Sequence, residues 1–220
     1  MLLVLQHADS FFPSGASAFS WGLEALCADG LVRDRSGVAE VLAGQIRDRW
    51  ATCDRAFLVA AHRAHRDLDA VISLDRRLNI MTLPREMREG SRRAGSALLI
   101  THGRIGTPGA AAYRSHVRQA AAPGHLPVVQ GLLWAGVGLN EATATAMALH
   151  GLCVSVASAA IRLSIISHVE AQQVIRSAHD AARAVLASPA PSVEEVLAYT
   201  PTADIAVMRH ETQATRLFAN

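Results

Sequence analysis

An uncharged stretch of twenty residues, 142–161, constrains the fold of this chain more than any other feature. It lies between Glu141 and Arg162 and is long enough to cross a membrane as a helix. Its composition favours another interpretation, because it contains several Thr and Ser residues with His150, and most of its apolar residues are Ala. Small side chains let helix backbones approach closely. We therefore expect a buried helix of a helical bundle, and a small membrane-associated protein remains an alternative.

The overall composition also favours helices. Half of the 220 residues are apolar, only 5% are aromatic, and Ala, the best helix former and a poor strand former, is abundant. The formal net charge of +2 gives no reason to expect binding to nucleic acid or to an anionic membrane. All 21 basic residues are Arg. Without Lys the chain has no phosphate-loop Lys, Schiff-base Lys or Ser-x-x-Lys nucleophile.

The pattern of apolar residues predicts an all-α fold, a compact single domain over residues 1–220 with about ten helical segments. An amphipathic helix is expected over Ser36–His65, with Ser36 as its N-cap, and another is expected to begin near Pro84. The sequence GRIGTPGA at 103–110 predicts a loop. A capping box of Ser192 and Glu195 predicts one further short helix.

Residues 76–93 hold six arginines with Glu86 and Glu89. A solvated helix face is the ordinary interpretation of such a charge-rich helix. Glu86 is followed by Gly90 four positions later, so it has no partner for an i,i+4 ion pair.

Three widely spaced cysteines, Cys27, Cys53 and Cys153, include no Cys-x-x-Cys pair. They indicate free thiols in a reducing compartment, and we expect a cytoplasmic protein, because the N-terminus also lacks the basic start of a signal peptide. His62 and His65 lie one helical turn apart, but no third ligand is placed to complete a metal site. No catalytic triad can be argued from the spacing. We expect neither a catalytic site nor a metal site.

Residues 8–26 read ADSxxPxGxxxxSxGLEAL and combine a chain break with a compact helix start. The break follows from proline and glycine geometry. This order of residues resembles the opening of the urease accessory protein family UreF. The positions that carry the motif are Asp9, Ser10, Pro13, Gly15, Ser20, Gly22 and Glu24.

The C-terminal sequence HETQATRLF is similar to the ending of the same family, although Ala214 stands where an aromatic residue is usual. Its matching positions are His210, Glu211, Gln213, Arg216, Leu217 and Phe218. A third, weaker similarity joins a basic residue, Arg162, to a later glutamine, Gln172. Resemblance therefore extends over nearly the whole chain.

This resemblance implies a non-catalytic scaffold for nickel insertion into urease, with no cofactor bound directly and nickel handled by the complex. The implied partners are the accessory protein UreD (also called UreH), the GTPase UreG and the urease apoprotein, and the implied state is a homodimer. We expect Glu24, Arg162, Gln172 and the C-terminal positions to contact partners. The alternative is a helical regulatory or ligand-binding domain unrelated to urease.

Overall fold

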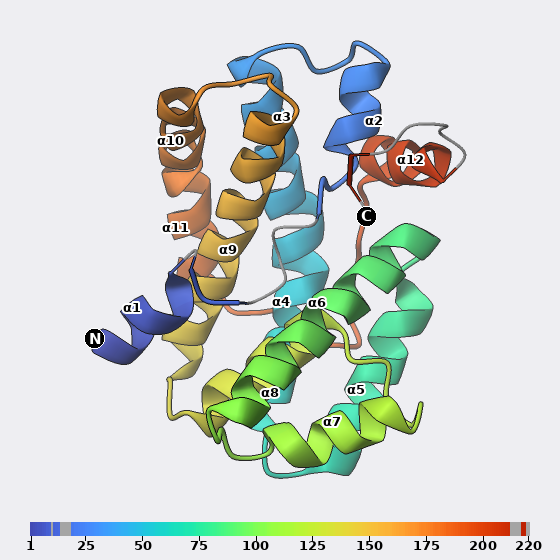
Figure 1. The fold of residues 1–220 in the computed structure, drawn as a ribbon, viewed down its shortest axis with the longest axis vertical. Coiled ribbons are helices and arrows are strands. Elements are labelled where there is room, and N and C mark those ends of the chain that lie inside the picture. Colours follow the sequence, from blue (N-terminus) through green and yellow to red (C-terminus); the bar gives the residue numbers. More distant parts are fainter. Residues whose placement is uncertain (10, 14–18, 212–216, 219–220) are drawn as a thin grey trace.

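A computed structural model describes residues 1–9, 11–13, 19–211 and 217–218, and these residues form helices without any strand. The predicted all-α fold is confirmed, and so is the number of about ten segments, since α3, η2 and α4 form one continuous rod and α10 and α11 are separated by one residue (Figure 1). The helices are α1 Leu2–Ala8, α2 Leu23–Ala28, α3 Arg35–Gln45, the π-helix η2 Ile46–Asp54, α4 Arg55–Arg63, α5 Leu68–Met81, α6 Arg85–Arg104, α7 Ala110–Arg118, α8 Leu126–Gly136, α9 Glu141–Arg162, α10 His168–Ser177, α11 His179–Ala187 and α12 Pro201–His210.

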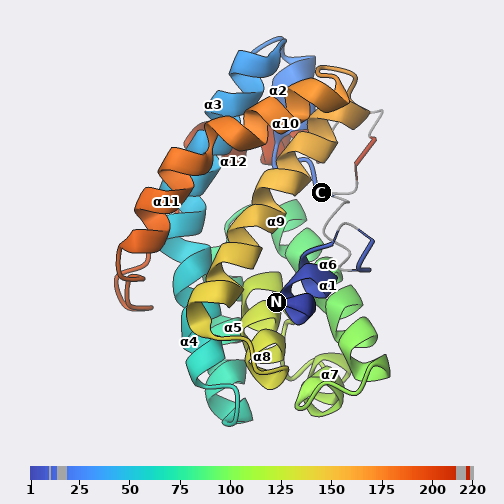
Figure 2. The same ribbon diagram turned by 90° about the vertical axis from the view of Figure 1, so that its left-hand side faces the viewer.

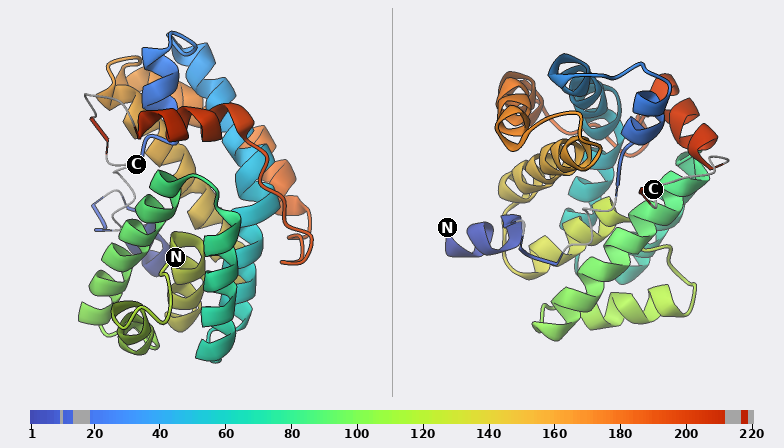
Figure 3. Two further views of the ribbon diagram at one scale, coloured as in Figure 1. Left: turned by 90° about the vertical axis from the view of Figure 1, so that its right-hand side faces the viewer. Right: turned by 45° about the horizontal axis from the view of Figure 1, so that its top comes forward.

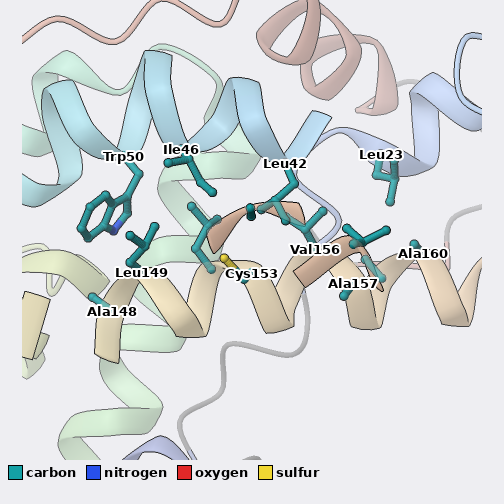
Figure 4. Packing of buried hydrophobic residues seen from close by; sticks show 14 of the residues in the cluster. Leu23, Leu42, Ile46, Trp50, Ala148, Leu149, Cys153, Val156, Ala157 and Ala160 are labelled. Atoms are coloured by element: carbon teal, nitrogen blue, oxygen red, sulfur yellow. The ribbon is translucent and has the colours of Figure 1, made fainter. Parts of the chain in front are cut away.

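The uncharged stretch forms α9, the central helix of the larger apolar cluster. Its length and hydropathy would suit a membrane span, but 67% of its most apolar window is buried inside the protein. Ala, Val and Cys side chains of α9 pack against Leu42, Ile46 and Trp50 of the neighbouring rod (Figure 4). α10 and α11 cover the outside of this layer (Figure 2). The chain therefore uses its apolar helix as the core of a helical bundle, as its composition predicts.

A second apolar cluster joins α4, α5, α6, α7 and α8 around Phe57 and Tyr113, both fully buried. α4 and α8 make the most extensive contact in the protein. Gly131 allows that contact, because a Cβ at this position would lie 2.2 Å from the carbonyl oxygen of Leu58. This part of the chain is rich in larger side chains, whereas α9 contributes small ones.

The buried carboxylate of Asp75 fixes the loop between α7 and α8. It accepts hydrogen bonds from the Tyr113 hydroxyl at 2.6 Å and from the backbone N–H groups of Gly124 at 2.5 Å and His125 at 2.9 Å. Burial raises the pKa of Asp75, and these bonds and the charge of Arg92 oppose that rise. We call Asp75 and its three donors the Asp75 node.

The rod α3–η2–α4 contains π-helical turns that the sequence pattern did not indicate. Its N-cap is Asp34, whose carboxylate accepts the N–H of Gly37 at 3.0 Å, so the prediction of Ser36 as N-cap is wrong by two residues. In η2 the carbonyl oxygens of Asp48 and Thr52 accept the N–H groups of Tyr199 and Leu197. π-Turns leave backbone groups open to such partners.

The segment between α11 and α12 lies along this rod and has no helix. Residues 193–195 form a turn, so the prediction that Ser192 and Glu195 begin a short helix is wrong. Two hydrogen bonds to η2 hold this segment along the rod. Arg55 holds the end of α11, where its guanidinium donates to the carbonyl oxygens of Val185 and Ser188 at 2.7 Å and 2.6 Å. Contacts with the rod outweigh the local capping signal.

Candidate functional site

The two sequence motifs meet in space, although almost the whole chain separates them. α2 and α12 lie side by side, with the N-terminal end of α6 next to α12 (Figures 1 and 3). Gly22 makes the approach possible: its φ is +81°, and a Cβ there would lie 2.9 Å from the carbonyl oxygen of Ala203 in α12. The glycine of the N-terminal motif is thus required by the position of the C-terminal helix.

His210 at the end of α12 lies between two carboxylates. Its Nε2 is 2.9 Å from Glu24 Oε2 and its Nδ1 is 2.8 Å from Glu86 Oε2. The imidazole is fully buried, and the side chains of Glu24 and Glu86 are 11% and 7% exposed. When the ring carries both protons it donates to both carboxylates, which compensates buried charge that would otherwise be costly.

Glu24 also holds the end of the chain. Its Oε1 accepts the backbone N–H of Leu217 at 2.6 Å, and its Oε2 accepts that of Phe218 at 3.1 Å. The Phe218 ring is 4% exposed, and the guanidinium carbon of Arg162 lies 4.2 Å from its centroid. A cation placed over an aromatic face is attracted by the ring. We call Glu24, Glu86, Arg162, His210 and Phe218 the Glu24 node.

The node sits in an environment of low polarity. Trp21, beside the motif glycine, donates its indole N–H to Ser155 of α9 at 3.2 Å. Burial, and then the negative charge of Glu24, raise the pKa of the Cys27 thiol to about 11. Burial likewise raises the pKa of Cys53 to about 12 and that of Cys153 to about 11, so all three thiols stay protonated and are free cysteines.

The other positions singled out from the sequence have different surroundings. Glu211 is paired with Arg85 at 3.1 Å, Leu217 is 54% exposed, and Gln172 is exposed on α10 with no contact to the Glu24 node among the described residues. Asp9 ends α1 and accepts the N–H of Phe11, and Ser20 is fully buried. The Pro13 carbonyl accepts from the Thr101 hydroxyl at 3.1 Å. Four predicted positions, Ser10, Gly15, Gln213 and Arg216, lie outside the described residues.

Glu86 is a member of the node that the sequence did not single out. It belongs to the charge-rich segment interpreted as a solvated face, yet it is buried. Two signals were present: Glu86 has no i,i+4 partner, and the Gly at that position, Gly90, marks a close contact. A Cβ on Gly90 would lie 2.2 Å from the ring of Phe19.

The comparisons with known proteins agree on one family. A family model described as UreF matches residues 32–179. The urease accessory protein UreF of Trichodesmium erythraeum (strain IMS101) is 32% identical over 228 residues, covering 100% of this chain and 96% of that protein. Those of Paenarthrobacter aurescens (strain TC1) and Yersinia enterocolitica are 32% and 27% identical, with 99% and 100% of this chain covered and 96% and 98% of theirs.

This chain belongs to the UreF family. The predicted family is thereby confirmed, and the alternative of a helical domain unrelated to urease falls away. As a UreF-family protein it is a urease accessory protein without catalytic activity of its own. No cluster of three or more His, Cys, Asp or Glu side chains that could hold a metal ion occurs within the described ranges. His62 and His65 instead bond to the carbonyl oxygens of Leu139 and His62.

Proposed function

We propose that this UreF-family protein is a cytoplasmic scaffold that bridges UreD (UreH) and the GTPase UreG while nickel is inserted into urease. In this proposal the protein is a homodimer, the complex handles the nickel, and the GTPase is modulated through its contact with this chain. The observation that carries the proposal is the Glu24 node. It attaches Leu217 and Phe218 to the core through their backbone N–H groups, which supports a role of this end of the chain in partner binding.

UreD is proposed to bind the C-terminal segment together with the outer face of α12. That helix buries Ala203, Ala206, Val207 and His210, whereas Ile205 and Met208 are 56% and 43% exposed. The exposed Leu217 follows in the same part of the chain. Apolar side chains grouped beside a polar rim are typical of protein interfaces. In this arrangement His210 and Phe218 anchor the segment, and Glu211, Gln213, Arg216 and Leu217 contact UreD.

UreG is proposed to bind near Arg162, Gln172 and the Glu24 segment. The guanidinium of Arg162 lies over the ring of Phe218. Arg forms forked hydrogen bonds with carboxylates and phosphates, so this position suits an acidic or nucleotide-proximal surface of the GTPase. The same ring contact couples the UreD-binding segment to the UreG-binding residue.

Co-purification of the full chain with UreD and UreG tests the proposal in two arms. Truncation after Glu211 removes residues 212–220 but retains His210 and the Glu211–Arg85 ion pair. We expect loss of the UreD complex with the helical circular dichroism signal preserved. Arg162→Ala should lose UreG and urease activation while keeping UreD, and Arg176→Ala on α10 is the matched control. Survival of the UreD complex in the truncated chain, or of UreG recruitment in Arg162→Ala, refutes the corresponding arm.

A further inference from the structure

Two large apolar side chains are exposed where α5 passes into α6. Ile80 is 78% exposed and Leu83 is 71% exposed, and only two residues separate them. The turn that carries them lies beneath α12 in Figure 3, left panel. Single exposed apolar residues are ordinary, but a pair on one turn with a charged border calls for an explanation.

Three arginines lie next to this pair along the two helices: Arg76 is one turn before Ile80 in α5, Arg88 bonds to the Leu83 backbone, and Arg92 is one turn after Arg88 in α6. All three are bound to neutral acceptors. Arg88 donates to the carbonyl oxygen of Thr82 at 2.7 Å and also to that of Leu83. Arg76 donates to the Ala121 carbonyl at 2.9 Å, and Arg92 donates to the Pro123 carbonyl at 3.2 Å. These bonds hold the guanidinium groups in place without cancelling their charge.

The positive charge of this border is not balanced locally. Within the described ranges, none of Arg76, Arg88 and Arg92 forms an ion pair, whereas Arg77 and Arg85 do. The charge of Arg92 acts on Asp75, but that carboxylate is fully buried and already accepts three hydrogen bonds. Glu86, one of the two acids of the segment, is turned inward to His210. We call Arg76, Ile80, Leu83, Arg88 and Arg92 the α5–α6 patch.

We propose that the α5–α6 patch is a docking surface for a protein whose apolar side chains are bordered by Asp or Glu. Guanidinium groups already held in place lose little conformational freedom on binding, and each still has N–H donors beyond the one used. An apolar centre favours a protein over a phosphate backbone, because a phosphate backbone has no apolar side chains to pack against Ile80 and Leu83. The inference rests on the proposed function in that the occupant is one of the urease-assembly proteins.

The test uses the full-length protein and three separately purified probes, UreD, UreG and the urease apoprotein. The double variant Ile80→Asp/Leu83→Asp changes exposed positions and should retain the wild-type melting curve. We expect its affinity for one probe to fall roughly tenfold or more, because it adds repulsion and removes the apolar contact. Ile105→Asp, at the other end of α6 and 53% exposed, is the matched control.

A second variant, Arg76→Gln/Arg92→Gln, keeps a donor at each loop carbonyl and removes the charge. Binding of the same probe should lose most of its salt dependence between about 50 and 250 mM NaCl. Unchanged affinity and salt dependence for all three probes in both variants overturns the inference. So does a loss confined to binding of phosphatidylserine vesicles or single-stranded RNA. If the wild-type protein binds none of the three probes, the proposed function itself fails.

Discussion

The Asp75 node and the Glu24 node each use one carboxylate to gather several donors, but they connect different parts of the chain. Asp75 is fully buried, and its donors come from α7 and the loop that follows it. Glu24 retains some exposure, and its donors come from the last helix and the chain end, 186 to 194 residues away in sequence.

The two nodes differ in how easily their hydrogen bonds can open. Tyr113 belongs to the second apolar cluster, and Gly124 and His125 are buried, so we expect the bonds of the Asp75 node to open only when that cluster opens. The tail bonds of Glu24 hold the backbone of Leu217 and Phe218, and the Leu217 side chain is exposed. Terminal segments open at lower cost than enclosed loops. A carboxylate of the first kind stabilises the fold, whereas one of the second kind holds the chain end in place.

Asp75→Asn should have the largest effect on stability. The side-chain amide N–H₂ replaces one oxygen and faces a backbone or hydroxyl donor, so at least one buried donor loses its acceptor. We expect the free energy of unfolding in urea to fall by about 3 kcal/mol. Asp69→Asn, exposed on the same helix, is the control and should change it by no more than about 0.5 kcal/mol. Equal unfolding curves for the two variants would mean that the loop is held by other contacts.

Acid should destabilise the Asp75 node through His125. Burial, and then the charges of Arg92, Arg49 and Arg88, lower the pKa of its imidazole from 6.5 to about 3. Below about pH 6.5 the imidazole is protonated in the unfolded chain but stays neutral in the folded chain. The contribution of His125 to the free energy of unfolding is therefore full above that pH and falls progressively below it. We expect this one group to lower the free energy of unfolding by about 2 kcal/mol between pH 7 and pH 5.

The variant His125→Gln keeps a donor toward Asn79 Oδ1 and should flatten this pH dependence in urea unfolding. Part of the slope should remain, because burial, and then the charge of His7, also lower the pKa of His102 to about 4. His150→Gln, on an exposed position of α9, is the control and should keep the wild-type slope. A wild-type slope in His125→Gln would contradict the assignment.

Glu24→Gln should cost less and act locally. The amide keeps one oxygen for its donors but turns N–H₂ toward another, so one tail bond is lost along with the charge. We expect a fall of about 1 kcal/mol in the free energy of unfolding. Hydrogen exchange at the amides of Leu217 and Phe218 should accelerate while exchange in α9 stays unchanged. Glu40→Gln, exposed on α3, provides the comparison, and retained protection at both tail amides would show that Glu24 is not the anchor.

The sequence predicted most of the fold because its helices are marked locally. Apolar periodicity, the helix start at Pro84 and the Gly-rich loop before α7 are all decided within a few residues. The π-turns of η2 and the absent helix at Ser192 depend on contacts between distant segments. At Ser192, the hydrogen bonds from Leu197 and Tyr199 to the rod outweigh the capping signal, and the Ser192 hydroxyl only donates to Glu194 within the local turn.

The sequence predicted several residues of the candidate site but not how they are arranged in space. Family resemblance singled out Glu24 and His210, but nothing in a one-dimensional pattern states that they are 2.9 Å apart. Glu86 was missed because a carboxylate among six arginines has the composition of a solvated face. Its buried role depends on α12, which lies more than a hundred residues further along the chain.

The π-helix η2 also limits which changes of length the chain tolerates. Each residue of a helix adds a fixed rotation about its axis, so deleting one residue from Ile46–Asp54 while keeping the π-turns would rotate all of α4. Arg55 would then point away from the carbonyl oxygens that it binds, and the segment leading to α12 would lose its alignment. Related chains should vary in length in their surface loops and keep the residue count of this rod constant.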